Sequence, residues 1–291
     1  MKPIVKTNPL VRVFALMAAL FSGMAYAGLV NDVPSCYEAN GIRPFSTPYD
    51  NLIYVLLDQT VQLDQELQKS VLDNTRRLMQ PGTKFVIAEF SAFSQEHYLT
   101  VLHTGIIENP IPPSNLGDVV ISKLRPFLNC LREQVVFAAR MALETEHQIM
   151  ESSASSLHHS DILQALKTVA GAVAQDSAKN KAVFVVTDGV ENSSVTSFYA
   201  RDSVRLIDPS TEIAKAKAAD LFSDFGGARI YVLGGGVMPP ATSGTTAQRD
   251  GYRNPQVLHA LSTFWHAYFK SSNADLVEFG EPALVEAVSW H

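Results

Sequence analysis

Two segments that lie far apart in the sequence each end an apolar run on an aspartate. Residues 53–57 stop at Asp58, and residues 182–187 stop at Asp188. Short runs rich in valine and isoleucine are typical of strands that are buried on both faces of a parallel sheet. Ligands of open parallel sheets bind beyond the carboxyl ends of the strands. We therefore expect these two carboxylates to meet at one edge of a sheet.

Other oxygen ligands accompany the two aspartates in the sequence. Thr60 and Gln62 follow Asp58, and Ser160 precedes a segment with helical periodicity. Carboxylate, hydroxyl and amide oxygens suit hard cations, so the residues predict a divalent metal site, with Mg²⁺ the first candidate and Mn²⁺ or Ca²⁺ as alternatives. The competing interpretation is that both aspartates only cap strand ends, as happens in many α/β proteins.

A hydrolytic interpretation of the same aspartates needs a general base nearby. Only His158 and His159, beside Ser160, are candidates for that role. The sequence contains no Gly-x-Ser-x-Gly nucleophile motif and no metal-binding histidine or cysteine spacing. We interpret the two histidines as part of a solvated loop and predict no catalytic residue, while a metal-dependent hydrolase stays open as an alternative.

Partner contacts are predicted in two places near the same edge. Phe198 and Tyr199 lie in a long irregular segment after Asp188, and long loops above a rigid sheet often carry binding residues. Gly235 is the middle residue of a glycine turn after a late strand. Its lack of a side chain would let a partner approach the backbone closely.

The first 27 residues have the pattern of a secretory signal peptide. A basic start precedes the apolar stretch 13–21, and Ala25-Tyr26-Ala27 is a small-x-small cleavage pattern. The alternative is an uncleaved anchor, although the stretch is short for a bilayer span. Removing Lys2, Lys6 and Arg12 with this segment changes the formal net charge from −6 to −9.

The acidic charge and the export signal restrict the classes of function. An acidic exported protein is a poor binder of nucleic acid or anionic lipid. No later stretch is apolar and long enough for a transmembrane helix, so we expect no stable membrane span after cleavage. The predicted location is the periplasm of a Gram-negative cell or the medium outside it.

The chain has two cysteines, Cys36 and Cys130. An even pair in an oxidising compartment suggests one disulfide, which would tie the N-terminal segment to the middle of the chain. Two unpaired buried thiols are the alternative. Residues 28–51 are proline-containing and show little periodicity, so we expect an extended arm there, followed by one domain over residues 52–291.

Strands and helices alternate along that domain. The expected strands are 53–58, 84–90, 98–104, 182–187, 229–233 and 275–279, and the expected helices are 63–79, 121–150, 160–174, 211–225 and 255–270. The short link between the second and third strands suits an antiparallel pair. The pattern predicts an α/β fold with a doubly wound, mostly parallel sheet, one antiparallel edge strand and helices on both faces.

Over roughly residues 50–280, the order of elements and the motifs resemble a von Willebrand factor A-type domain. Asp58 and Thr60 match the Asp-x-Ser-x-Ser motif of that family, with Gln62 in place of the second serine. Ser160 matches the hydroxyl before the central helix, and Asp188 matches the aspartate of Thr-Asp-Gly after the fourth strand. The resemblance implies a metal-ion-dependent adhesion site of a variant type.

The same resemblance implies a mode of binding. In this family, an aspartate or glutamate of a partner protein can complete the coordination of the ion. We therefore expect a protein-interaction module for adhesion or assembly within an envelope, secretion or conjugation apparatus. A purely structural domain whose metal site has lost its function is the main alternative, because Gln62 departs from the motif.

Overall fold

A computed structural model describes residues 31–91, 99–153, 160–200, 203–237 and 254–291. Within these residues six strands form one sheet in the order β3-β2-β1-β4-β7-β8. The β3 strand runs antiparallel to β2, and the other neighbours are parallel. This confirms the predicted doubly wound α/β sheet with one antiparallel edge strand. The predicted signal peptide lies outside the described residues.

The elements follow the predicted order. The sheet strands are β1 Asn51–Asp58, β2 Thr83–Phe90, β3 Leu99–Ile107, β4 Asn180–Val186, β7 Arg229–Leu233 and β8 Asp275–Phe279, and a small pair consists of β5 Tyr199–Ala200 and β6 Ser203–Val204. The helices are α2 Cys36–Ala39, α3 Gln65–Leu78, the 3₁₀ helix η2 Pro113–Asp118, α4 Ile121–Ser152, α5 Ile162–Gln175, α6 Pro209–Ala218 and α8 Pro255–Ser271.

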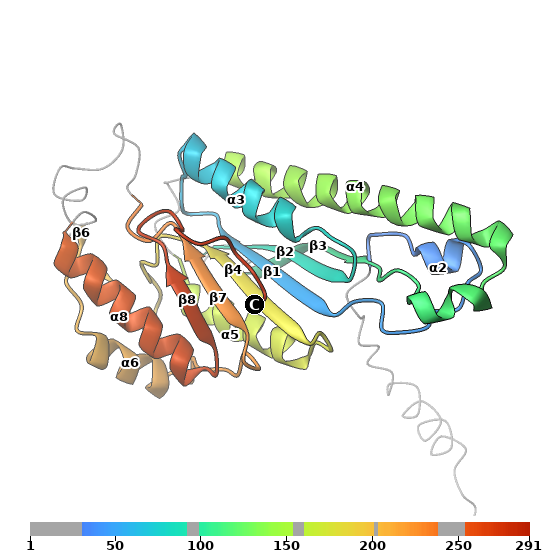
Figure 1. Cartoon of the computed structure of the whole chain (residues 1–291). Helices are drawn as coiled ribbons and strands as arrows, with labels where there is room; N and C mark the ends of the chain where they lie inside the picture. Colours follow the sequence, from blue (N-terminus) through green and yellow to red (C-terminus); the bar gives the residue numbers. More distant parts are fainter. Residues whose placement is uncertain (1–30, 92–98, 154–159, 201–202, 238–253) are drawn as a thin grey trace, which may run out of the picture. The chain divides into compact units, whose positions relative to one another are not determined.

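Alternate side chains of the central strands belong to two hydrophobic cores, one on each face of the sheet. Leu52 and Leu56 of β1 join the core that contains α5 and α8, whereas Ile53 and Val55 join the core that contains α3 and the second half of α4. Successive side chains of a strand point to opposite faces, so an unbroken apolar run fits a strand covered on both sides. Figure 1 shows these helices in two layers with the sheet between them.

Two differences from the sequence prediction have local causes. The helix expected over residues 211–225 ends at Ala218, and Asp220 then adopts a left-handed backbone with φ of 55°. That conformation is incompatible with continuing a right-handed helix. Residues 31–50, expected as an extended arm, contain the short helix α2, whose N-cap Ser35 accepts a hydrogen bond from the Glu38 backbone.

A disulfide joins Cys36 of α2 to Cys130 of α4, with 5.7 Å between the Cα atoms. This confirms the predicted pairing. A third small core surrounds the bond, and in it the ring of Tyr37 packs edge-on against Phe127 at 4.7 Å between centroids. Residues 31–291 form one compact unit. None of the helices in the described part of the chain has the length and apolarity of a membrane span.

Candidate functional site

The register of the two central strands places Asp58 beside Thr187 at the carboxyl edge of the sheet. In the parallel pairing of β1 with β4, Leu57 lies opposite Val186, so the next residue of each strand also meets the other. The neighbours of β1 are β2 on one side and β4 on the other, which makes this the point where the chain reverses its winding. Ligands of doubly wound sheets bind in the crevice at such a switch point.

Asp58 is 3% exposed and receives four hydrogen bonds. The backbone N–H and the hydroxyl of Thr60 donate to Oδ1 at 2.9 and 2.7 Å. The hydroxyls of Ser160 and Thr187 donate to Oδ2 at 2.9 and 2.8 Å. Burial raises the pKa of Asp58 above its ordinary value, although these hydrogen bonds oppose the rise. Among the residues that the structure describes, no cationic side chain contacts Asp58, so a negative charge here would be compensated by hydrogen-bond dipoles.

Ser160 is held in place by the start of α5 and by the segment after β4. Its carbonyl accepts from the Asn192 backbone at 2.9 Å, and Asp161 caps the helix by accepting from the Gln164 backbone. Glu191 is fully buried, and its Oε2 accepts from the Leu163 backbone at 3.0 Å in the first turn of the helix. Burial raises the pKa of Glu191 to about 8.

Asp188 begins a tight turn directly after Thr187. Its Oδ1 accepts from the Val190 backbone at 2.8 Å, and Gly189 between them has φ of +75°, which favours glycine. The Gly189 carbonyl also accepts from the indole N–H of Trp265 at 2.9 Å. The turn is therefore fixed from both sides, and Asp188 lies at the sheet edge next to Thr187.

Gln62 is engaged at a different place. Its side-chain N–H donates to the carbonyl of Ser153, just after α4, at 3.2 Å. The amide thus links the loop after β1 to the end of α4. The structure brings Asp58, Thr60 and Ser160 into one hydrogen-bonded cluster and gives Gln62 a partner outside it.

Of the two partner contacts predicted in the segment after Asp188, one lies in the core. Phe198 is fully buried, and its ring meets Phe264 of α8 edge-on at 5.1 Å, so this residue belongs to the core. The prediction for Phe198 is wrong, because the segment folds back over α8 rather than standing above the sheet. Tyr199 in β5 is only partly buried.

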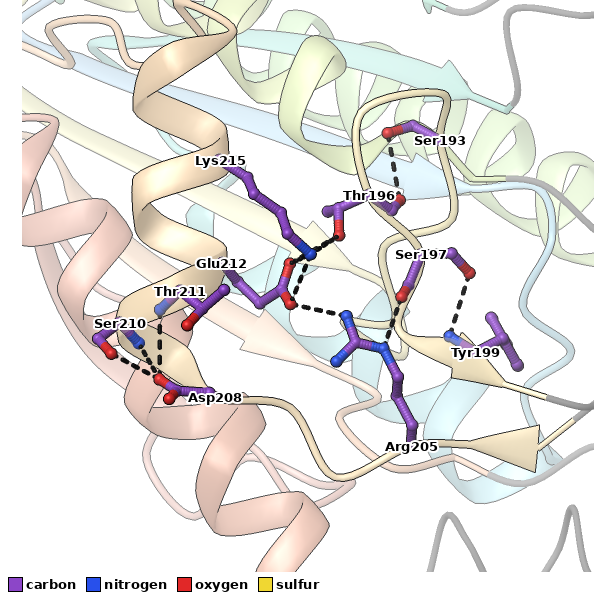
Figure 2. A network of polar contacts seen from close by, with 10 residues as sticks. All are labelled: Ser193, Thr196, Ser197, Tyr199, Arg205, Asp208, Ser210, Thr211, Glu212 and Lys215. Atoms are coloured by element: carbon purple, nitrogen blue, oxygen red, sulfur yellow. Dashed lines mark hydrogen bonds and ion pairs between the residues drawn. The ribbon is translucent and has the colours of Figure 1, made fainter.

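A charged cluster fixes the same segment to α6, as Figure 2 shows. Glu212 is 2% exposed and pairs with Arg205 at 2.7 Å and with Lys215 at 3.1 Å. Thr196 donates its hydroxyl proton to the other oxygen of Glu212 at 2.6 Å. Burial acts to raise the pKa of Glu212, but the hydrogen bonds from Arg205, Thr196 and Lys215 hold it below its ordinary value.

Gly235 also lies inside the fold. A Cβ atom at this position would come within 2.6 Å of the Gly280 carbonyl oxygen and 2.5 Å of the Phe279 ring. Glycine is needed here so that the turn after β7 can pass the end of β8. This corrects the prediction that the absence of a side chain at Gly235 serves the approach of a partner.

Sequence reasoning missed the part played by Thr187 and by Glu191. The motif gives Thr187 no role beyond preceding Asp188, whereas an alignment of the ends of the two central strands places it beside Asp58. Nothing in the sequence indicates that Glu191 is buried, because a glutamate after a strand is ordinarily exposed. His158 and His159, the candidate bases of the hydrolytic alternative, lie outside the described residues.

The donor set at the edge fits a hard divalent cation through its hydroxyls. Thr60, Ser160 and Thr187 each use a proton toward Asp58, and a hydroxyl that donates retains oxygen lone pairs for a cation. The ranges that the structure describes contain no group of three or more His, Cys, Asp or Glu side chains arranged for a metal. A cation at this edge would depend on hydroxyl oxygens together with Asp58 and Asp188.

Comparisons with known proteins give no family. No protein-family model matches the sequence, and no curated protein matches it. Among solved structures, an aerotolerance-related membrane protein from Bacteroides fragilis is similar at 15% identity and a TM-score of 0.33, over 78% of this chain and 92% of that one.

Two surface proteins are similar at the same level. The pilus adhesin SpaC from Lactobacillus rhamnosus is 11% identical with a TM-score of 0.35, over 74% of this chain and 27% of the adhesin. The minor pilin PilB from Streptococcus sanguinis is 12% identical with a TM-score of 0.35, over 82% of this chain and 59% of the pilin. This chain therefore spans less than two thirds of the adhesin and of the pilin. The architecture rests on the strand order of this chain, not on these similarities.

Proposed function

We propose that this chain is an exported protein-interaction module that binds another protein through a divalent cation at the carboxyl edge of its sheet. The observation that carries the proposal is the convergence of three hydroxyls on one buried carboxylate at the switch point of the sheet. Such a cluster provides oxygen ligands and an uncompensated acidic group in one place. Both features favour a cation.

In this proposal Asp58, Thr60, Ser160 and Asp188 hold the ion, and Thr187 joins them. Mg²⁺ is the first candidate, with Mn²⁺ and Ca²⁺ as alternatives. When bound, the ion supplies a positive centre to which an aspartate or glutamate of the partner can bind. The residues of the chain supply the fixed geometry, because Asp58 orients the three hydroxyls and the first turn of α5 fixes Ser160.

The setting that we propose is the envelope of a Gram-negative cell or the space outside it. The signal-peptide pattern of residues 1–27 and the acidic charge of the remaining chain support this location. Adhesion, or assembly of an envelope, secretion or conjugation apparatus, would use such a module. We propose a role in binding rather than in catalysis, and the resemblance to von Willebrand factor A-type domains supports the same choice.

A structural domain without a metal is the second candidate, and two contacts favour it. The side-chain N–H of Gln62 donates to the carbonyl of Ser153 and so points away from the cluster. Each oxygen of Asp58 already accepts two hydrogen bonds. A protonated Asp58 would be stable in such surroundings, because burial raises its pKa.

Calorimetric titration of the purified protein with Mg²⁺, Mn²⁺ and Ca²⁺ separates the two candidates. We expect saturable binding by the wild type and none by Asp58→Asn or Asp188→Asn, while Asp64→Asn serves as the matched control. Asp64 is an exposed N-cap on the same loop and has no place in the cluster. Absence of binding by the wild type would leave the structural domain.

Capture of partners from an envelope extract, with and without EDTA, then tests the adhesive role. We expect a partner that is retained in Mg²⁺ and released by EDTA. A partner that stays bound in EDTA and also binds Asp58→Asn would contradict recognition through the ion.

A further inference from the structure

The long helix α4 carries two apolar stripes, of which only one faces the protein. Phe127, Leu131, Ala138, Ala142 and Ile149 are buried and are spaced by four or seven residues, as expected for the inner face of a helix. A second stripe begins at the first residue of α4, where Ile121 is 85% exposed, and continues through Leu128 to Val136, which is 69% exposed. The second stripe has no structural role within the described residues.

Exposed apolar surface is concentrated around this stripe. Of the eleven large hydrophobic side chains that are exposed among the described residues, six lie between positions 116 and 137: Leu116, Val120, Ile121, Leu128, Val136 and Phe137. Single exposed apolar residues are ordinary, whereas a concentration of them in one region of the surface is typical of an interaction site.

The first half of the second stripe is hollowed. A shallow depression of about 420 Å³ is lined by six residues of α4: Ile121, Leu124, Arg125, Leu128, Asn129 and Arg132. Leu124, one of these six residues, also packs against the core around the disulfide. Figure 1 shows α2 alongside this half of α4, whereas α3 lies alongside the other half.

The charge of this region is opposite to that of the whole protein. Residues 121–143 contain Lys123, Arg125, Arg132 and Arg140 but one acid, Glu133, while the chain as a whole has a net charge of −6. Among the described residues no carboxylate pairs with Arg125 or Arg132, the two arginines of the hollow. Their charges are therefore available to an acidic partner.

We propose that the first half of α4 is a docking site for an acidic amphipathic helix of a partner protein. Apolar side chains of that helix, spaced by three and four residues, would cover Ile121 and Leu128, and its flanking carboxylates would pair with Arg125 and Arg132. Arginine presents several donors in a rigid fork that matches a carboxylate. The disulfide between Cys36 and Cys130 fixes this part of α4, so the surface is preorganised for binding.

A membrane surface fits the same residues less well. Recognition of anionic lipid ordinarily uses clusters of about four to eight lysines and arginines. The four basic residues of this region are at the lower end of that number, and one of them, Lys123, already donates to the Gly41 carbonyl. The protein is also acidic overall, and a depression suits inserted side chains better than it suits a flat bilayer.

The proposed docking site is separate from the cluster at the sheet edge. The α4 helix has 32 residues and is about 48 Å long. The C-terminal end of α4 lies at the carboxyl edge of the sheet, because Gln62 contacts Ser153 there. The first half of α4 lies near the opposite edge, because Cys36, which is bonded to Cys130 of α4, donates its backbone N–H to Glu108 at that edge. Two partners could thus be bound at opposite ends of one rigid domain.

Binding of a designed probe tests the proposal. The probe is a fluorescein-labelled helical peptide of about 18 residues, with leucines spaced by three and four residues and glutamates on both flanks. We expect saturable binding by fluorescence anisotropy that weakens as salt is added. Charge reversal in Arg125→Glu/Arg132→Glu should weaken binding by about tenfold or more, and Ile121→Asn should weaken it by a similar factor.

Two controls keep the test specific. Val285→Asn replaces another apolar side chain, 93% exposed and far along the sequence, and should bind the probe like the wild type. All variants should keep the wild-type thermal midpoint, because the replaced side chains are exposed. A probe with lysine in place of every glutamate should not bind the wild type.

Several outcomes would overturn the proposal. One is equal binding of the acidic probe by the charge-reversed variant, and another is equal binding of the lysine probe. Binding to phosphatidylserine vesicles without binding to the probe would assign the stripe to a membrane. Self-association in sedimentation that is lost in Ile121→Asn would assign it to a second copy of the chain, and binding of the probe only after removal of residues 1–27 would assign it to that segment.

Discussion

Two buried carboxylates of this protein have opposite electrostatic surroundings. Asp58 at the sheet edge and Glu212 beside the 196–205 segment are 3% and 2% exposed. Hydroxyls and a backbone N–H surround Asp58, and its pKa is raised, whereas Arg205 and Lys215 contact Glu212, and its pKa is lowered. Within the described ranges, cationic side chains contact Glu212, whereas Asp58 receives hydrogen bonds from neutral donors.

The difference separates a structural ion-pair cluster from a candidate binding site. A buried charge that is paired within the chain fixes one segment to another, as Glu212 does for the segment over α6. A buried acidic group without a cation is costly in its charged form, so its surroundings favour either a proton or an incoming metal ion.

The largest effect is expected for the paired carboxylate. Glu212→Gln should lower the free energy of unfolding by about 2 kcal/mol, because it weakens the charge-assisted hydrogen bonds from Arg205 and Lys215, whose own side chains stay partly exposed. In EDTA, Asp58→Asn should change the same quantity by about 1 kcal/mol or less, since the hydroxyls around it can turn to suit an amide. Urea unfolding at pH 7 measures both, and an equal loss in the two variants would remove the contrast.

Metal addition should act on the unpaired carboxylate alone. At a free Mg²⁺ concentration ten times the dissociation constant, the wild type should gain about 1.4 kcal/mol of stability. Glu212→Gln should gain the same amount, and Asp58→Asn should gain none. The thermal midpoint with and without Mg²⁺ measures this effect, and a gain retained by Asp58→Asn would contradict the proposed site.

Stability should depend on pH with opposite signs for a buried carboxylate without a cationic partner, such as Glu146, and for one with cationic partners, such as Glu212. Glu146 of α4 is fully buried with Thr75 as a partner, and burial raises its pKa to about 8. Its contribution to stability is complete below the unfolded pKa of about 4.5 and is lost as the pH rises toward 8. Relative to Glu146→Gln, the wild type should lose about 1 kcal/mol between pH 6 and pH 7.

Glu212 should show the reverse behaviour on the acid side. Because its folded pKa is lowered, its contribution is present above the unfolded pKa of about 4.5 and is lost as the pH falls through the folded value. The advantage of the wild type over Glu212→Gln should therefore shrink below about pH 4.5. Urea midpoints across the pH range measure how the free energy of unfolding changes with pH for each carboxylate. A change of the same sign for Glu146 and Glu212 would show that cationic partners do not determine this pH dependence.

The smallest effect is expected at Gln62. Gln62→Ser removes one partly buried hydrogen bond to the Ser153 carbonyl and should cost about 0.5 kcal/mol. If Gln62 lies outside the metal ligands, the Mg²⁺ affinity of this variant should stay equal to that of the wild type or rise. A loss of affinity comparable to that of Asp58→Asn would instead make the Gln62 amide oxygen a ligand and enlarge the site.

Much of the fold could be predicted from patterns that act over short distances. The β7 strand at Arg229–Leu233 and the β8 strand at Asp275–Phe279 have the predicted limits, because each is short and mostly apolar and lies next to turn residues. The end of α6 was not predicted, because an aspartate is compatible with a helix and its residue type alone does not indicate the left-handed conformation of Asp220. The disulfide was predicted from its compartment and the count of cysteines, which the sequence supplies directly.

The candidate site was predictable in part for the same reason. Asp58, Thr60 and Ser160 are found by motif, and the structure joins them in one cluster. Thr187 and Glu191 were missed, because the register of β1 with β4 and the packing of α5 determine what they contact. Phe198 was misjudged, because a sequence shows that a long segment exists but not which surface it covers.

The sequence by itself determined that this chain alternates strands with helices, ends two apolar strands on acids and carries two cysteines for one bond. These are local properties of side-chain type and spacing, so they need no knowledge of the folded state. Only the tertiary structure decided which buried carboxylate receives counter-charges and which receives hydroxyls. It also decided that one stripe of α4 is left exposed. Those outcomes depend on residues far apart in the sequence, which only the packing of the sheet and its helices brings together.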